Sequence, residues 1–355
     1  MKTETIKSIF KEFDHKANYV SHSELNSGHI NDTFLVKTDG ENNYILQKIN
    51  HNIFKDVPGL VNNKVLTSNH IKSKYPNLSE EELSKKVLSF VKTKKTDFYY
   101  HKENGDFWNV MIFIDNSVTH EIVKDKEIAY EGGKLLGEFL NLTSDFDSNK
   151  LIDVIPNFHD MSFRYKQYAS SLQSASKSRL NKAAKYTKIV AELKDEMHIL
   201  QELKEEGKIP VRVTHNDTKI SNSLFDKNNK GMCMIDTDTV MPGIIHYDFG
   251  DAIRTICNTA AEDEKDLSKV EFNLDYYKAY EKGFLEQSKE SLSAIGLKYL
   301  PLAAKTMIFI MAIRFLTDFL NNDVYYKTNY SEHNLDRAKN QFKLIESFTE
   351  KTKIK

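Results

Sequence analysis

The sequence predicts an α+β fold with two lobes: a small β-rich lobe over residues 1–117 and a larger, mostly helical lobe over residues 118–355. Short β-favouring runs dominate the first third of the chain, and long segments with apolar residues at helical spacing dominate the rest. One loop-rich segment, residues 211–251, interrupts the helices. This segregation of strands from helices indicates two layers of different kinds with a cleft between them.

Each expected element rests on its pattern and on the residues that bound it. The first two strands flank a polar connection at residues 38–43, and the next two flank a turn around Gly105. Asp115, Asn116 and Ser117 then break the pattern, so we place the lobe boundary there. In chain order we expect a helix over residues 1–13, strands over 30–36 and 44–49, a helix over 61–74, strands over 96–101 and 108–114, and helices over 126–142, 162–206, 274–286 and 299–320.

Composition is that of an ordinary globular protein, with 40% hydrophobic and 28% charged residues and a net charge of −1. The balanced charge gives no reason to expect a nucleic-acid partner. The N-terminus lacks the pattern of a signal peptide, and the most apolar window, residues 306–313, is too short to span a membrane. Two cysteines, Cys233 and Cys257, without metal-like spacing favour a reducing compartment. We expect a cytoplasmic protein, monomeric and without membrane contact.

The segment from Thr214 to Asn222, followed by Asp236, holds the groups that phosphoryl transfer from a nucleotide requires. Asp217 is the expected catalytic base, which would orient and deprotonate an attacking hydroxyl. Asn222 lies five residues later and Asp236 fourteen residues after that, and we expect these two to hold Mg²⁺. Taken alone, Asp217 is better interpreted as a turn aspartate that accepts backbone hydrogen bonds, as most loop aspartates do. Its spacing to Asn222 and Asp236 favours catalysis.

Three neighbours of these residues have alternative roles. His215 is expected to support the loop by hydrogen bonding rather than to react. Lys219 would place an ammonium group where charge develops on the transferred phosphoryl group, and its alternative is a solvated surface lysine. Asp238 shares a face with Asp236 if the strand continues, and is either a second metal ligand or an acid of the pocket.

The tripeptide Asp248-Phe249-Gly250 spells the magnesium-binding motif of protein kinases, yet we do not assign it the metal. A metal-binding Asn and Asp must lie on the two arms of one hairpin, and residues 224–235 supply that hairpin between Asn222 and Asp236. Asp248 is 26 residues beyond Asn222. It is expected to begin a helix and to buttress the catalytic loop.

The expected nucleotide site is assembled from weaker signals, because neither a P-loop nor a dinucleotide-binding glycine motif is present. The turn with Gly28, Asn31 and Asp32 could offer amides and polar side chains to phosphates, or be a simple hairpin turn. Lys48, on a strand, could reach the α- and β-phosphates or face solvent. No Glu follows on the next helix to pair with it. Backbone groups near Ile112 and Ile114 are the expected adenine contacts.

These motifs resemble the aminoglycoside phosphotransferase family, the protein-kinase-like group that phosphorylates small molecules. His215, Asp217, Asn222 and Asp236 match the family's His-x-Asp, Asn and Ile-Asp-x-Asp/Glu pattern. The similarity narrows toward bacterial N-acetylhexosamine 1-kinases in the stretches GHINDTFLV, LQKIN, IPNFHD, THNDTKISN, IDTDTVMPG, HYDFGDAIR and IRFLTD, the last followed by DVYY, within residues 28–330.

The resemblance implies a protein-kinase-like fold that uses ATP and Mg²⁺ to phosphorylate the anomeric hydroxyl of N-acetylglucosamine or N-acetylgalactosamine. It places sugar contacts at Asp217, Lys219, Arg314 and Tyr325. The pocket could further include Phe158, His159 and Arg164. Arg314 is noteworthy in itself, since it interrupts an apolar helix; its alternative is a salt bridge to Asp318.

Three rival functions remain open at the level of the sequence. The first is the same chemistry on choline, homoserine, an aminoglycoside or another sugar, although Lys219 and Arg314 favour a neutral or anionic acceptor. The second is a nucleotide-binding protein without catalysis, which the intact set of Asp217, Asn222 and Asp236 opposes. The third is a metal hydrolase, for which the necessary histidine spacings are not found.

Overall fold

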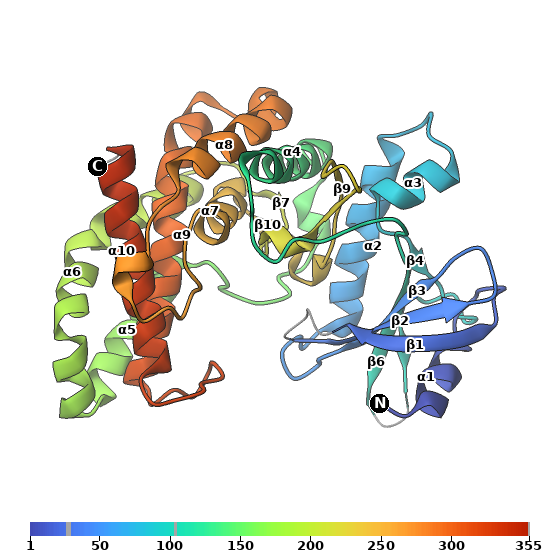
Figure 1. The fold of residues 1–355 in the computed structure, drawn as a ribbon, viewed down its shortest axis with the longest axis horizontal. Helices are drawn as coiled ribbons and strands as arrows, with labels where there is room; N and C mark the ends of the chain where they lie inside the picture. Colours follow the sequence, from blue (N-terminus) through green and yellow to red (C-terminus); the bar gives the residue numbers. More distant parts are fainter. Residues whose placement is uncertain (26–29, 103–104, 354–355) are drawn as a thin grey trace.

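The strands of the N-terminal part form one antiparallel sheet, seen in blue and teal at one end of the molecule (Figure 1). The computed structural model describes residues 1–25, 30–102 and 105–353. The sheet order is β1-β2-β3-β6-β4, and β5 also pairs with β6. The strands are β1 (Tyr19–Leu25), β2 (Asp32–Thr38), β3 (Tyr44–Ile49), β4 (Phe90–Val91), β5 (Tyr100–His101) and β6 (Phe107–Ile112).

Helix α1 (Thr3–Phe10) covers one face of this sheet. It buries Ile6, Ile9 and Phe10 in a cluster with Phe34 and the fully buried Trp108. Such a stripe at helical spacing is what an amphipathic surface helix requires. A cross-strand register that pairs Tyr44 with Ile112 brings the β3 and β6 side chains of this cluster together.

Helix α2 (Val57–Ser73) joins the sheet to the rest of the molecule. Asp56 caps it by accepting the Gly59 amide hydrogen bond at 2.9 Å, which satisfies one of the free N-terminal donors. Asn63 of α2 donates to the Ile152 and Val240 carbonyl oxygens, both at 2.8 Å. These contacts tie α2 to the C-terminal part. The short helix α3 (Glu80–Lys86) follows, begun by a capping box at Ser79.

The C-terminal part is helical and packs around α9 (Ala294–Leu320), whose side chains are mostly buried. By length and composition alone α9 could cross a membrane, but 83% of its apolar window is buried inside the protein, as in a core helix. Helices α5, α7 and α10 contact it (Figure 1). The other helices are α4 (Lys126–Leu142), α5 (Met161–Ser174), α6 (Lys177–Glu205), α7 (Ile245–Ile256), α8 (Leu274–Ser288), α10 (His333–Thr352), and the 3-10 turns η1 (Ser148–Lys150), η2 (Ile220–Asn222), η3 (Thr237–Thr239), η4 (Leu267–Lys269) and η5 (Lys289–Ser291).

Helices α4 and α8 approach each other closely at glycines. A Cβ on Gly133 of α4 would lie 2.1 Å from the Tyr280 carbonyl oxygen of α8, and a Cβ on Gly283 of α8 would lie 2.1 Å from the Tyr130 oxygen of α4. Both distances are far below van der Waals contact, so only glycine permits this packing.

Two small antiparallel ribbons hold the loop-rich segment between these helices. β7 (Arg212–Thr214) pairs with β10 (Met241–Gly243), and β8 (Ser223–Phe225) pairs with β9 (Gly231–Met234). The second ribbon is the hairpin predicted between Asn222 and Asp236. A third of the segment's residues lie in neither strand nor helix, yet the side chains from Val240 to Gly250 are nearly all buried.

The predicted α+β, two-lobed fold is confirmed. The strand at residues 44–49 and the helix at residues 126–142 have the expected bounds. The helix expected over residues 162–206 is two helices, α5 and α6, because Ser176 interrupts it and caps α6 by accepting the Arg179 amide at 3.3 Å. The boundary between residues 117 and 118 stays a prediction.

Candidate active site

The loop after β7 is held from behind by a buried carboxylate. Asp248, at the start of α7, accepts the backbone N–H groups of His215 and Asn216, each at 2.7 Å. The Thr218 hydroxyl donates to the Asp248 carbonyl oxygen at 2.7 Å. The prediction that Asp248 buttresses this loop from a helix entry is therefore confirmed. Asp248 is fully buried, so it cannot also bind a metal in an open site.

Asn216 bends the loop immediately before Asp217. Its φ is 64°, a left-handed conformation in which Asn is less strained than most residues. Its side-chain amide donates to the Thr239 carbonyl oxygen at 2.9 Å and to the Thr214 hydroxyl at 2.9 Å, which fixes the bend. The Asp217 side chain is thereby presented to an open cavity, where it is 34% exposed.

His215 supports the same loop, as predicted. Its ring is buried, and Nε2 donates to the Ile235 carbonyl oxygen at 2.9 Å. Burial lowers the pKa of His215, although the Asp217 carboxylate acts in the opposite direction. These contacts indicate that His215 is neutral and that its ring links the loop to the β9 arm of the hairpin.

Asn222 and Asp236 lie side by side at the open end of the β8–β9 hairpin. The Ile235 amide donates to the Asn222 carbonyl oxygen at 2.8 Å, so the two arms are joined directly before Asp236. The Asn222 side-chain NH₂ donates to the Asp217 carbonyl oxygen at 2.9 Å. That contact leaves the Asn222 amide oxygen available as a ligand. Asp236 has a φ of 58°, a strained conformation of the kind that collects at functional sites.

All four predicted reaction and metal residues border one cavity of about 420 Å³ between the sheet and the helical part. They are Asp217, Lys219, Asn222 and Asp236. The Lys219 ammonium lies 3.5 Å from the Asp217 carboxylate. The structure brings these four residues together, as their spacing in the sequence predicts.

The electrostatics of this cavity fit a divalent cation. Desolvation, together with the carboxylates of Asp238 and Asp217, raises the pKa of Asp236 to about 7. Burial opposes charge on Lys219, but Asp217 and Asp236 raise its pKa overall. An amide oxygen and a carboxylate next to surplus negative charge are the oxygen ligands that Mg²⁺ accepts alongside phosphate and water.

Asp238 lines the cavity but is already occupied by donors from the N-terminal part. Asn31 and Gln47 donate side-chain N–H bonds to its Oδ2 at 2.5 and 3.1 Å, and the Lys64 ammonium is paired with its Oδ1. Of the two alternatives for Asp238, these contacts favour an acid of the pocket over a second metal ligand. Lys64 and Gln47 were not among the predicted site residues.

The apolar lining of the cavity includes Ile112 and Ile114, the two residues expected near adenine. Leu25, Ile45 and Leu224 complete this apolar wall. A planar base fits such a wall, since ligand pockets are mostly apolar with a few polar groups that orient the ligand. Asn31 also borders the cavity, whereas Gly28 lies outside the described residues.

Asp32 and Lys48 do not border the cavity, which corrects two predicted nucleotide contacts. The two residues are paired across β2 and β3, so their side chains share one face of the sheet. Thr33 and Gln47, one position along, share the other face and line the cavity. Lys48 instead lies 3.0 Å from the Asp106 carboxylate. Because side chains alternate along a strand, a shift of one residue exchanges the two faces.

Arg314 and Tyr325 border a second, smaller cavity of about 200 Å³ rather than the one with Asp217. Arg314 does not pair with Asp318, and within the described part of the chain it forms no ion pair; its guanidinium lies 5.5 Å from the Phe158 ring and 5.7 Å from the Tyr326 ring. Arg164 borders this cavity too, and burial together with Arg314 lowers its pKa to about 10.

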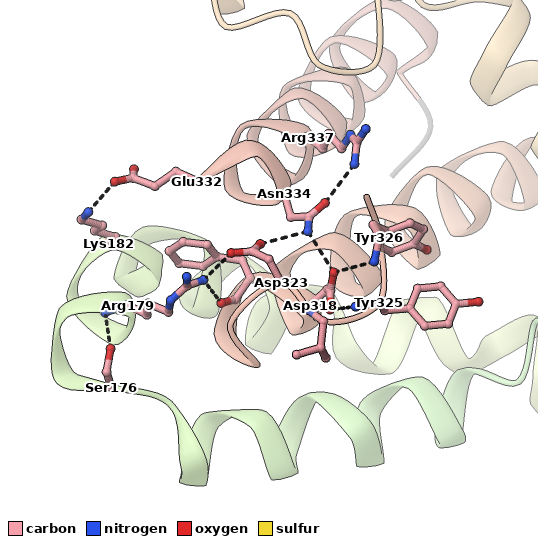
Figure 2. Close-up of polar contacts among 12 residues, drawn as sticks. Ser176, Arg179, Lys182, Asp318, Asp323, Tyr325, Tyr326, Glu332, Asn334 and Arg337 are labelled. Atoms are coloured by element: carbon pink, nitrogen blue, oxygen red, sulfur yellow. Dashed lines mark hydrogen bonds and ion pairs between the residues drawn. The ribbon is translucent and has the colours of Figure 1, made fainter. Parts of the chain in front are cut away.

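Asp318 holds the loop that carries Tyr325. Its carboxylate accepts the backbone N–H groups of Val324, Tyr325 and Tyr326 at 3.0, 2.8 and 2.9 Å, and the Asn334 side chain at 2.9 Å. Figure 2 shows these contacts and the Tyr325 ring pointing away from Asp318. The Tyr325 side chain is 71% exposed, so it is open to a ligand.

The His159 ring packs against the rings of Phe158 and Tyr247, at centroid distances of 4.4 and 5.4 Å. The His159 ring is buried, and it is close enough to Asp251, Arg164 and Arg314 to interact with their charges. The backbone of Asn216, in the loop that carries Asp217, also interacts with the His159 ring and acts to raise its pKa.

The match of residues 98–286 to the model of the phosphotransferase enzyme family covers more than half of the chain. This protein belongs to that family. It is a small-molecule kinase of the protein-kinase-like type.

Solved structures with the same fold include three small-molecule kinases. A microcompartment-associated aminopropanol kinase has a TM-score of 0.64 and 14% identity, over 100% of this chain and 99% of its own. An amicoumacin kinase bound to AMP-PNP and Ca²⁺ has a TM-score of 0.62 and 9% identity, over 98% and 94%. Choline kinase from Cryptosporidium parvum Iowa II has a TM-score of 0.58 and 16% identity, over 99% and 97%.

Proposed function

We propose that this kinase transfers the γ-phosphoryl group of ATP, with Mg²⁺, to the C1 hydroxyl of N-acetylglucosamine or N-acetylgalactosamine. The observation that supports it most is the placement of Asp217, Lys219, Asn222 and Asp236 around one cavity that also has an apolar lining. The acceptor is inferred from the motifs of the sequence, because the similar structures act on other small molecules.

In the proposed reaction Asp217 accepts the proton of the C1 hydroxyl as its oxygen attacks the γ-phosphorus. The new bond joins that oxygen to phosphorus, and the bond from phosphorus to the bridging oxygen of ADP breaks. Lys219, 3.5 Å from Asp217, would offset charge that develops on the transferred group. Asn222 and Asp236 would hold Mg²⁺, which neutralises phosphate charge when it is bound. The anomeric hydroxyl is more acidic than an ordinary alcohol, so a carboxylate base suffices.

The charge of the second cavity favours a neutral or anionic acceptor. Arg164 and Arg314 both border it, and the Nε of Arg164 is buried with no hydrogen-bond partner in the described part of the chain. Donors of this kind suit oxygen atoms, such as sugar hydroxyls and an acetamido carbonyl. A quaternary ammonium or a polycationic aminoglycoside would meet repulsion at the same place.

The second candidate is the same chemistry on another small alcohol. The fold is shared with kinases whose names give aminopropanol, choline and amicoumacin as substrates, which keeps this candidate open. The positive charge of Arg164 and Arg314 at this cavity, neither of which forms an ion pair with a described residue, is the observation that ranks a cationic alcohol below a sugar.

An ATP-consumption screen tests the acceptor. The panel contains both N-acetylhexosamines, unacetylated hexoses, choline, homoserine and an aminoglycoside, and ³¹P NMR locates the new phosphate. We expect turnover with an N-acetylhexosamine and phosphate on C1. Phosphate at C6, or preferential turnover of a cationic alcohol, would contradict the proposal.

A further inference from the structure

The cavity-facing position of strand β3 is not a lysine. Gln47 occupies it, 7% exposed and bonded to Asp238, while Lys48 faces the other side of the sheet and pairs with Asp106. Kinases commonly place a lysine on this strand to meet the phosphates, paired with a glutamate of the next helix. Here both positions differ, since α2 has no glutamate.

A lysine enters the same space from the helix. Lys64 lies in the buried stripe of α2 with Leu60 and Val61, and it is only 2% exposed. Its ammonium donates to the Gln47 side-chain oxygen at 3.2 Å and to Asp238 Oδ1. Lys64 and Lys219 are the two cationic side chains among the described residues that border the 420 Å³ cavity.

The hydrogen-bond count leaves Lys64 with one donor to spare. An ammonium group has three N–H donors, and the described residues accept two of them. The Phe90 ring, 5.6 Å from the nitrogen, offers no hydrogen-bond acceptor of comparable strength. A buried ammonium is costly unless its donors are met, so an anionic oxygen in the cavity would complete this group.

Asp238 and Gln47 hold the Lys64 ammonium group in place and accept two of its three N–H donors. Asp238 receives donors from Asn31, Gln47 and Lys64, so its charge is met from three sides. It lies two residues after Asp236, the expected metal ligand. Lys64 is therefore fixed next to the position where the phosphates and their metal are expected.

We propose that Lys64 of helix α2 is the lysine that binds the phosphates of the nucleotide, in place of a strand lysine, and that Gln47 and Asp238 position its ammonium group. This rests on the proposed use of a nucleoside triphosphate in the cavity. Its alternative is a purely structural tie between α2 and the segment around Asp238.

Calorimetric titration of the full-length protein with AMP-PNP·Mg²⁺ and with adenosine separates these possibilities. We expect Lys64→Met to weaken AMP-PNP binding at least about tenfold, as loss of a charge-assisted contact does, and to change adenosine binding less than about twofold. Lys48→Met is the matched control and should bind both as the wild type does. Equal weakening of both ligands by Lys64→Met, or loss confined to Lys48→Met, would overturn the proposal.

Two further variants distinguish phosphate binding from the structural tie. Asp238→Asn keeps Lys64 but removes the carboxylate that positions its ammonium group; it should weaken AMP-PNP binding by less than Lys64→Met does and change adenosine binding less than about twofold, and equal weakening of both ligands would overturn the proposal. The double variant Gln47→Lys/Lys64→Met moves the lysine to the strand and should recover at least about half of the lost binding free energy. If the double variant has the same melting temperature as Lys64→Met but recovers no AMP-PNP binding, that result contradicts the proposal.

Failure of the proposed function gives a different result from failure of this inference. Wild-type protein that binds neither AMP-PNP nor adenosine would refute nucleotide binding altogether. Wild-type binding that Lys64→Met leaves intact would refute only the role of Lys64.

Discussion

Two carboxylates near the catalytic loop, Asp217 and Asp248, illustrate how surroundings assign different tasks to one side chain. Asp248 is fully buried, and its two carboxylate oxygens accept hydrogen bonds from the backbone N–H groups of His215 and Asn216. Asp217 is 34% exposed, borders the cavity and has Lys219 at 3.5 Å. A buried carboxylate with fixed donors organises backbone, whereas an accessible one can exchange a proton with a ligand.

We expect Asp217→Asn to lower kcat by roughly 10²–10⁴-fold, because the amide cannot accept the acceptor's proton. Nucleotide binding should remain within about threefold of wild type, since the expected metal ligands are untouched. Steady-state kinetics and calorimetry measure the two effects. Asp32→Asn, which lies on the opposite face of the sheet, is the control and should be fully active. Wild-type turnover by Asp217→Asn would remove Asp217 from the role of base.

His159 predicts a pH dependence of stability. Burial lowers its pKa from 6.5 to about 3, with Asp251 acting against this and Arg314 and Arg164 adding to it. As the pH falls through 6.5, His159 is therefore protonated in the unfolded chain but stays neutral in the folded protein. The neutral ring's contribution is complete above pH 6.5 and falls as the pH drops toward 3.

Urea denaturation at pH 7.5 and 5.5 checks this linkage. The wild type should lose about 1.4 kcal/mol more between the two pH values than His159→Gln, which has no group that titrates there. Parallel losses in both proteins would mean that His159 is protonated in the folded state at pH 5.5.

The residues of the candidate site were predictable to different degrees. Asn222 and Asp236 were, because chain spacing alone puts them at the end of one hairpin. Lys48 and Asp32 were not, because strand register decides which face a residue takes, and register depends on partners distant in sequence. Lys64 was missed since a lysine in a helix is expected in solvent, and only the tertiary fold shows its burial.

At the scale of elements, the second cavity is lined by α5, by α9 and by the loop that follows α9. Asp318 of α9 and Asn334 of α10 meet over this loop, and Asn334 also donates to Asp323 at 2.9 Å (Figure 2). Arg179 of α6 reaches Asp323 at 2.8 Å. Three helices thus fix the loop that presents Tyr325.

We expect Asp318→Ala to release this loop, since three backbone N–H groups lose their acceptor. The KM for the acceptor should rise about tenfold while the KM for ATP stays within about twofold. Hydrogen exchange of residues 324–326 should accelerate. Asp336→Ala, which removes a pair with Lys339 on the outer part of α10, should change neither KM. A rise confined to the KM for ATP would contradict this assignment of the loop.

Elements were predictable where pattern and boundary agreed, as for β3 and α4. Strands β4 and β5 have two residues each, too few for an alternating pattern to emerge. Helix α10 lacks a side-chain cap, and its first residue follows Glu332 with a φ of 74°, so no start signal was available. The division between α5 and α6 depends on one serine within a continuous helical pattern.

At the scale of the whole molecule, the cavity is bordered by residues from both the sheet and the helical part. Leu25 and Ile45 come from the sheet, and Leu224 and Asp236 come from the hairpin beyond it. A ligand in this space contacts both parts at once. Ligand binding should therefore stabilise the molecule as one unit rather than one half of it.

ATP with Mg²⁺, at 100 times its dissociation constant, should raise the free energy of unfolding by about 2.7 kcal/mol. The thermal transition should stay single and move upward. Excess EDTA should remove most of this shift, because phosphate charge next to Asp217 and Asp236 is then uncompensated. An equal shift with and without EDTA would contradict a metal site at Asn222 and Asp236.

The close glycine contact between α4 and α8 also affects the position of the β8–β9 hairpin, which packs against α4. Glu131 of α4 accepts the Gly231 amide at 3.2 Å and so anchors the far end of the β8–β9 hairpin. A methyl group on Gly283 must push α4 outward, because its obstacle is the Tyr130 carbonyl oxygen and not a movable side chain. That displacement would travel along α4 to Glu131 and tilt the hairpin whose open end carries Asn222 and Asp236. With Asn222 and Asp236 as the proposed metal ligands, we therefore expect metal affinity to respond to a substitution about fifty residues later in the chain, at a position outside the cavity.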